Sequence, residues 1–248
     1  MYNYQQQQQQ QQVRRGSRGR KALIWVGVVL VLLVGLDFGG RAFAESEAAT
    51  QLQKQGFPTK PSVSIGGFPF LTQVISKHFD QITISASNIP AGPITITSMH
   101  VVAKDVRISS YTSFSGGTTG PLNGSIFISL GSLGSALSAA GPLASFVTGG
   151  NGLKVVTVGN NEVKGSLQLA GGLVSWSAVW MVRTVGPNEI DLHLVSSSGL
   201  PAALQSGAQD VRLPLSSLPA GLTLSGGLTS SGDGITATVS ANSLKFGS

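Results

Sequence analysis

The sequence predicts a mainly β protein of the α+β class with few helices. Short runs in which apolar and polar residues alternate recur along the chain, and glycine- or proline-rich turns separate them. Hydrophobic residues make up 41% of the 248 residues and charged residues 10%, while glycine occurs 33 times. This composition is too apolar for a disordered chain, and with the alternating runs it is typical of antiparallel β structure.

The first 41 residues differ in composition from the rest. Residues 1–21 contain eight consecutive glutamines and five basic residues without an acid, which predicts a disordered, basic, cytoplasmic tail. Residues 22–41 begin with the apolar run Ala22–Leu36, which suits a short transmembrane signal-anchor. The preceding basic residues predict that the rest of the chain lies outside the cytoplasm. A cleaved signal peptide is the alternative, because Ala42-Phe43-Ala44 has the small-x-small form of a cleavage site.

Residues 42–248 are expected to form a single extracytoplasmic, β-rich domain that opens with a helix. Alanine, glutamate and glutamine dominate Phe43–Gln55, and Gly56 and Pro58 are helix stop signals. The stretch Pro61–Val74 then begins as a strand, with Val63 and Ile65 on one face.

A glycine pair, Gly66-Gly67, interrupts this strand. Because paired glycines and Pro69 disfavour regular sheet pairing, we expect a bend or bulge here. The chain is expected to resume as the extended segment Phe68-Pro69-Phe70-Leu71, with both rings at the bend.

Alternating apolar residues predict the remaining strands. These are Gln81–Ser87, Ile94–Ile108, Ile126–Leu130, Leu153–Val158, Val163–Leu169, Leu173–Val185, Ile190–Val195, Leu213–Leu215, Leu222–Leu228 and Ile235–Val239. A second helix is expected over Leu130–Val147, where Pro142 must break or kink it. Within Leu173–Val185 every second residue from Val174 to Val182 is apolar, which gives this strand one wholly apolar face.

The charge pattern and the missing motifs exclude several classes of function. From Ala42 onward ten Lys and Arg residues face nine Asp and Glu residues, so this part carries about +1 and offers no electrostatic surface for nucleic acid. The chain has no cysteine, and no two histidines lie at ligand spacing, so we expect no metal and no cofactor. No hydrolase or nucleotide-binding motif occurs, so we expect no catalytic residues. Asp191 and His193 are interpreted as an exposed polar strand face.

Apolar surface is what the sequence offers instead. An acyl chain of about 16 carbons gains roughly 12 kcal/mol on leaving water, at about 0.8 kcal/mol per methylene, so a protein that holds one needs a dry groove but no catalytic group. A curled antiparallel sheet closed by one or two helices can supply it. The candidate groove residues are Ile65, Phe68, Phe70, Leu71, Val74, Trp176, Trp180 and Val182. The alternative is that these faces simply bury one another.

The run from Val63 to Val74 (VSIGGFPFLTQV) resembles the signature of the actinobacterial LmeA-like phospholipid-binding proteins, whose best-known members act in mycobacterial lipomannan elongation. The order of the basic tail, the hydrophobic segment and the alanine-rich helix is also similar, and the resemblance as a whole covers about residues 37 to 246. The resemblance implies a strongly curved antiparallel sheet wrapped on one or two helices, similar to tubular lipid-binding (BPI-like) domains. It implies a phospholipid partner and no catalytic residues.

Together these observations predict a membrane-anchored phospholipid-binding or lipid-transfer protein that works outside the cytoplasm and supports assembly of the cell envelope. A non-catalytic envelope scaffold with a solid β core, which contacts proteins or glycans through its loops, is the alternative. A hydrolase using serine and His193 is a third and more distant hypothesis. The oligomeric state does not follow from the sequence.

Overall fold

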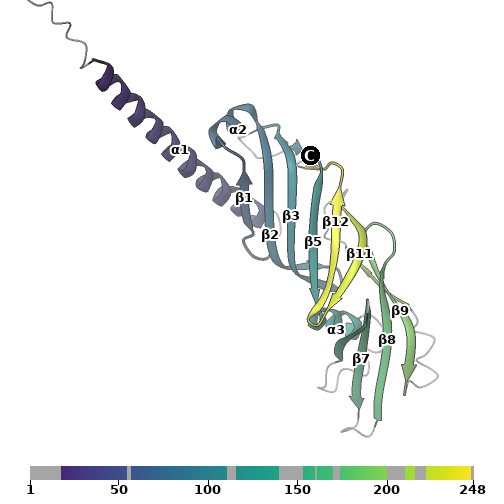
Figure 1. Cartoon of the computed structure of the whole chain (residues 1–248). Coiled ribbons are helices and arrows are strands. Elements are labelled where there is room, and N and C mark those ends of the chain that lie inside the picture. The colour runs from purple at the N-terminus through teal and green to yellow at the C-terminus, as the bar shows by residue number, and fades with distance from the viewer. Residues whose placement is uncertain are drawn as a thin grey trace, which may run out of the picture.

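A computed structural model describes residues 18–54, 57–110, 116–139, 153–159, 161–169, 174–199, 210–215 and 222–246. Over these residues the chain forms three helices and thirteen strands, and every strand pairing is antiparallel. Figure 1 shows two open, twisted sheets with α1 projecting from one end. The prediction of a mainly β fold built from curved antiparallel sheets is confirmed.

The helices and strands have the following bounds. The helices are α1 (Arg18–Lys54), α2 (Phe70–Ser76) and α3 (Leu130–Ala139). The strands are β1 (Ser62–Gly66), β2 (His78–Ala91), β3 (Ile94–Ile108), β4 (Gly117–Thr118), β5 (Leu122–Ser129), β6 (Lys154–Gly159), β7 (Glu162–Leu169), β8 (Val174–Thr184), β9 (Glu189–Ser198), β10 (Asp210–Pro214), β11 (Thr223–Ser231), β12 (Gly234–Ala241) and β13 (Lys245–Phe246).

The first sheet has eight strands in the order β1-β2-β3-β5-β12-β11, and the short strands β4 and β13 pair beside β3. Its strand register puts apolar residues on one face and hydroxyl residues on the other, the pattern of a sheet with one buried face. One row across the buried face contains Val63, Ile84, Val101, Gly124 and Val239. The adjacent row, on the outer face, contains Ser62, Ser85, His100, Ser125 and Thr238.

The second sheet has five strands in the order β10-β9-β8-β7-β6. It joins the first sheet beside the edge strand β11, where the backbone N–H of Leu224 donates to the carbonyl oxygen of Pro187 at 2.7 Å. The hydroxyl of Ser230 also donates to the carbonyl oxygen of Gly159 at 2.9 Å. Helix α3 lies between the sheets, and its buried Leu133 and Leu137 belong to one continuous apolar core that both sheets share. The rest of the predicted helix Leu130–Val147 lies outside the described residues.

Helix α1 is continuous over 37 residues. The sequence predicted an anchor over residues 22–41 and a separate helix over Phe43–Gln55, but no proline or turn lies between them to end a helix. By length and composition α1 is also the one helix within the described ranges that is able to cross a membrane. Large apolar side chains between Val26 and Phe38 are exposed, whereas Ala49 in the second half of the helix is buried. The division into an anchor and a domain at residue 42 remains a prediction.

Helix α2 replaces the extended segment that was expected after the glycine pair. Gly67 has φ +91°, and a cis peptide bond joins Phe68 to Pro69. The helix begins at Phe70 and ends where Lys77 adopts a left-handed conformation, with φ 56°. Phe70–Ser76 is too short to show helical periodicity in the sequence, and the contacts described below stabilise it. The predicted bend is therefore present, but the chain leaves it as a helix.

Candidate functional site

The corner formed by β1 and α2 brings together four of the candidate groove residues. Ile65 and Phe70 are buried in the shared core, and Leu71 and Val74 pack against it. The ring of Phe70 lies 6.3 Å from that of Phe79, centroid to centroid. Phe68 instead lies at the surface, where 66% of it is exposed. Phe68 and Phe70 would share a face in a strand, but the start of α2 between them separates their directions.

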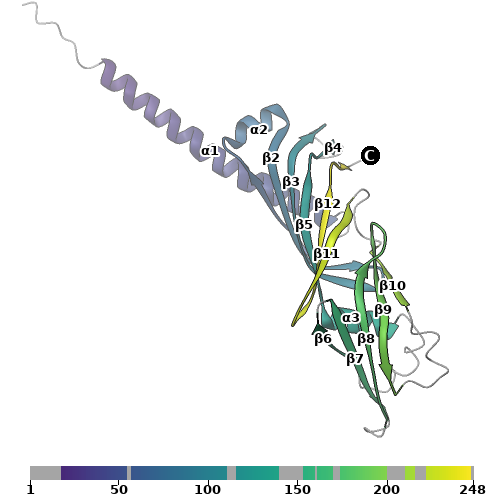
Figure 2. The same cartoon turned by 45° about the vertical axis from the view of Figure 1, so that its right-hand side comes forward.

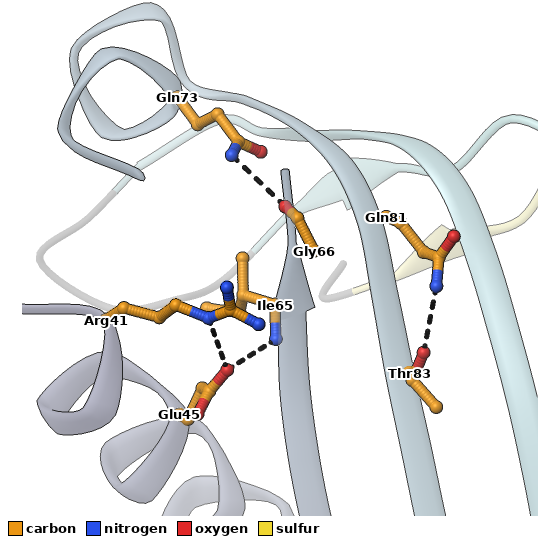
Figure 3. Close-up of polar contacts among 7 residues, drawn as sticks. All are labelled: Arg41, Glu45, Ile65, Gly66, Gln73, Gln81 and Thr83. Atoms are coloured by element: carbon orange, nitrogen blue, oxygen red, sulfur yellow. Dashed lines mark hydrogen bonds and ion pairs between the residues drawn. The ribbon is translucent and has the colours of Figure 1, made fainter. Parts of the chain in front are cut away.

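Helix α1 fixes the position of this corner through two acidic side chains, Asp37 and Glu45. The carboxylate of Glu45 accepts a hydrogen bond from the backbone N–H of Ile65 at 2.7 Å and pairs with Arg41 at 3.0 Å (Figure 3). The carboxylate of Asp37, which is buried, accepts a hydrogen bond from the backbone N–H of Leu71 at 2.8 Å. These two acids therefore satisfy one exposed N–H of the edge strand β1 and one unpaired N–H of the first turn of α2.

Gln73 closes the corner from the other side. Its amide nitrogen donates to the carbonyl oxygen of Gly66 at 3.1 Å, as Figure 3 shows, and its amide oxygen accepts from the backbone N–H of Asp80 at 2.9 Å. Sequence reasoning did not identify Gln73, Asp37 or Glu45 as residues of this corner. The available signal was weak, namely a single acid at the end of an apolar run and a glutamine three residues after a phenylalanine.

Strand β8 carries the other three candidate groove residues, Trp176, Trp180 and Val182, and all three are buried. The two indole rings meet edge to face, with centroids 5.8 Å apart and planes at 66°. Gly165 on β7 makes room for them, since a Cβ atom there would lie 2.8 Å from Cζ3 of Trp180. The predicted apolar face of this strand therefore packs inward, and a glycine on the neighbouring strand accommodates its largest ring.

Both indole N–H groups on β8 lack a hydrogen-bond partner among the residues that the structure describes. The Nε1 atoms of Trp176 and Trp180 are buried, and no described acceptor lies within hydrogen-bond distance of either. A buried, unpaired donor costs roughly 1–3 kcal/mol, so native proteins rarely keep two of them side by side. Tryptophan normally finds an acceptor when it is buried. The β8 face is thus apolar but carries two N–H donors for which the described residues supply no acceptor.

The structure places the candidate residues in two groups rather than one. The corner group lies where α1 joins the first sheet, and the β8 group lies in the second sheet, away from α1 (Figures 1 and 2). One continuous buried apolar core nevertheless contains Ile65, Phe70, Trp176, Trp180 and Val182. Any ligand that contacts both groups must therefore be long and apolar.

A family model described as LmeA-like phospholipid-binding matches residues 35–240. This match contains the corner, α3, the second sheet and all of the first sheet except β13 and the last residue of β12. The chain belongs to the LmeA-like phospholipid-binding family. Neither the curated proteins nor the solved structures contain a match to this chain.

The outer face of the first sheet of this LmeA-like chain carries an open groove of about 490 Å³. It is lined by Lys60, Ser62, Ser85, Ala86, Ser87, Ser98, Met99, His100, Ser125 and Phe127. The hydroxyl of Ser85 and Nδ1 of His100 lie 2.9 Å apart, and Nζ of Lys60 donates to the hydroxyl of Ser46 at 3.2 Å. Five of these ten residues are serines, so the groove offers hydroxyl groups to a polar ligand beside the apolar side chains of Ala86, Met99 and Phe127.

Ionisable side chains on β8, β9 and β10 form separate polar contacts. Nε of Arg183 lies 2.7 Å from Oδ2 of Asp191, and Nδ1 of His193 lies 2.6 Å from Oδ1 of Asp210. Asp191 is only 2% exposed, so interpreting it as part of an exposed polar strand face was wrong. It is buried because Arg183, on the neighbouring strand, covers it. Within the described part of the chain, no three His, Cys, Asp or Glu side chains gather to hold a metal ion.

Proposed function

We propose that this LmeA-like protein is anchored in a membrane by α1 and holds phospholipid acyl chains, without catalysis, in the apolar interior that its two sheets share. The observation that carries the proposal is that interior: in a member of a phospholipid-binding family, one continuous apolar core extends from the α1 end of the molecule to β8. The candidate acyl-contact residues are Ile65, Phe70, Leu71, Val74, Trp176, Trp180 and Val182.

The energetic balance supports an acyl ligand. Transfer of a chain of about 16 carbons from water stabilises it by roughly 12 kcal/mol. The interior must open to admit the chain, which costs packing contacts between the buried side chains. Opening at the joint between the sheets disrupts fewer hydrogen bonds than separation of two paired strands, because only a few backbone groups cross that joint. A lipid ester oxygen that reaches β8 also gives Trp176 or Trp180 the acceptor that each lacks.

The orientation of the anchor supports work in the cell envelope. The basic residues 14–21 precede the apolar part of α1, which by the positive-inside rule leaves the sheets outside the cytoplasm. The phospholipid then supports assembly of envelope lipids or lipoglycans, of which lipomannan is the example that the family resemblance suggests.

Native mass spectrometry of the full chain released from detergent micelles tests lipid binding. We expect one phospholipid to remain bound after detergent has removed the lipids that surround the helix. A synthetic helix of residues 18–54 is the control, because it has the same membrane-facing surface and no interior. If the full chain loses lipid as readily as this helix does, the proposal is wrong.

A second candidate function is a non-catalytic envelope scaffold with a solid β core. The hydroxyl-lined groove around His100 favours it, because such a surface suits glycans. This alternative predicts that the chain retains no lipid but binds glycans, and that Ser125→Trp abolishes the glycan binding.

A further inference from the structure

The end of the domain that lies nearest the first half of α1 exposes large apolar side chains. Phe68, in the turn before α2, is 66% exposed, and Ile75, within α2, is 83% exposed. Phe38, on the adjoining turn of α1, is also exposed. These side chains lie on α1 and on the segment around α2, which the bond between Asp37 and Leu71 holds together. Apolar side chains of this size are costly to leave in water, so their exposure on two joined segments points to an interaction surface.

Two contacts fix the position of α2 along the axis of α1. Asp37 accepts the hydrogen bond from Leu71, and the ring of Phe70 lies 3.5 Å from the position that a Cβ atom would occupy on Gly40. Helix α2 therefore lies level with residues 37–40 of α1. In both views it extends further toward the N-terminal half of α1 than the strand ends beside it (Figures 1 and 2).

The length of the apolar run predicts that the outer boundary of the membrane lies at this same position along α1. Ala22–Leu36 contains 15 residues, which span about 22 Å at about 1.5 Å per residue. The hydrocarbon core of a bilayer is about 30 Å thick, so about five further residues must lie at its outer edge. Because Lys21 precedes the run, those residues are 37–41, the part of α1 that contacts α2.

The polar side chains in this part of α1 are compatible with a position at the outer boundary of the bilayer. The carboxylate of Asp37 is covered by α2 and bound to the N–H of Leu71, so it does not face lipid. The guanidinium of Arg41 pairs with Glu45, one turn further from the membrane. An ionisable group at a membrane boundary is tolerated when protein covers it or when it pairs toward the polar side.

We propose that Phe68 and Ile75 insert into the outer boundary of the bilayer in which α1 is anchored, and we call these two residues the insertion pair. The partner is the lipid surface itself. The inference rests on the proposed membrane anchoring by α1 and adds a second attachment point, which seats the β1–α2 corner against the lipids. Lipid then has a direct path from the bilayer to the buried residues Ile65 and Phe70, which lie behind the insertion pair.

The absence of cysteine from the chain allows a clean test with a single environment-sensitive label. The full-length variants Phe68→Cys and Ile75→Cys are each labelled with the fluorophore NBD. They are then reconstituted in phosphatidylcholine–phosphatidylglycerol vesicles that contain doxyl-labelled lipid. Leu32→Cys, on the lipid-facing part of α1, is the positive control. Val195→Cys, an exposed apolar position on β9 in the second sheet, is the negative control.

We expect labels at positions 32, 68 and 75 to show blue-shifted emission and quenching by doxyl lipid. Iodide dissolved in the water should quench the label at position 195 several-fold more strongly than the other three labels. Ile75→Glu should reduce the doxyl quenching of a label at Phe68→Cys and leave the melting temperature unchanged. Labels at 68 and 75 that behave like the label at 195 overturn the inference. If the label at 32 is also in water, the anchoring is wrong as well. Retention of phospholipid in native mass spectrometry decides separately whether lipid binding stands.

Discussion

The carboxylate of Asp37 in α1 accepts a hydrogen bond from the backbone N–H of Leu71 in α2, at 2.8 Å. This bond joins the helix that is apolar enough to cross a membrane to the corner that carries the family signature. Helix α1 is therefore a structural part of the domain. A chain cut at residue 44 loses this contact, so lipid binding is best measured on the full chain.

Asp37→Leu should destabilise the corner, because it leaves the N–H of Leu71 covered and without an acceptor. A buried donor that loses its partner costs about 1–3 kcal/mol. Thermal melts of the full chain in one detergent measure the effect. Asp37→Asn is the control, since its amide oxygen is still able to accept the bond and its melting temperature should fall less. Equal melting temperatures for Asp37→Leu and the unmodified chain contradict the assigned role.

Gly67→Ala should destabilise the same corner for two reasons. Gly67 has φ +91°, a conformation that costs an alanine about 1–2 kcal/mol. A Cβ atom there would also lie 2.6 Å from the amide nitrogen of Gln73, so Gln73 must move and weaken its two hydrogen bonds. Gly226→Ala isolates the first effect, because Gly226 has φ +80° and no atom within 4 Å of the added Cβ. Chemical denaturation should show a loss at Gly67 larger by about 1–3 kcal/mol; equal losses argue against the steric contribution.

The two phenylalanines of the Phe-Pro-Phe turn should respond in opposite ways to a charge. Phe70→Asp places a carboxylate in the apolar core, at a cost of several kcal/mol, and should unfold the domain or remove its lipid. Phe68→Asp places the same charge at the surface and should leave the free energy of unfolding within about 0.5 kcal/mol of its original value. The matched pair is compared by chemical denaturation. Equal stability of the two variants contradicts the burial of Phe70.

Trp176→Phe and Trp180→Phe should weaken lipid binding with little loss of stability. Each change removes an N–H that has no partner among the described residues, and the relief offsets part of the cost of the smaller ring. If the N–H groups bind lipid oxygens, each variant should retain several-fold less phospholipid in native mass spectrometry. Unchanged retention in both variants shows that the indole N–H groups do not bind lipid.

Much of the sheet structure is predictable from the sequence because alternation is a local signal. The expected strand Ile94–Ile108 coincides with β3, and Val174–Thr184 lies within the expected Leu173–Val185. The outer hydroxyl face follows from the same alternation. These elements are long enough for a period of two residues to be unmistakable.

The elements that the sequence did not predict depend on contacts between distant residues. Helix α2 is a single short element that Asp37, 34 residues away, helps to hold. Asp191 is buried because Arg183 on the adjacent strand covers it, and alternation along one strand contains no information about its neighbour. The candidate residue Phe68 was grouped with Phe70 on the assumption of an extended segment, which the start of α2 removes.

The most direct test of an acyl-binding interior is photo-crosslinking of the full chain, reconstituted in vesicles, to a phospholipid with a diazirine at the end of its acyl chain. Bulk bilayer lipid can label α1 and α2, whereas β8 lies in the second sheet, away from α1 (Figure 2). Peptide mapping by mass spectrometry should find labelled residues within Val174–Thr184, beside Trp176 and Trp180. Label confined to α1 and α2 would contradict the account.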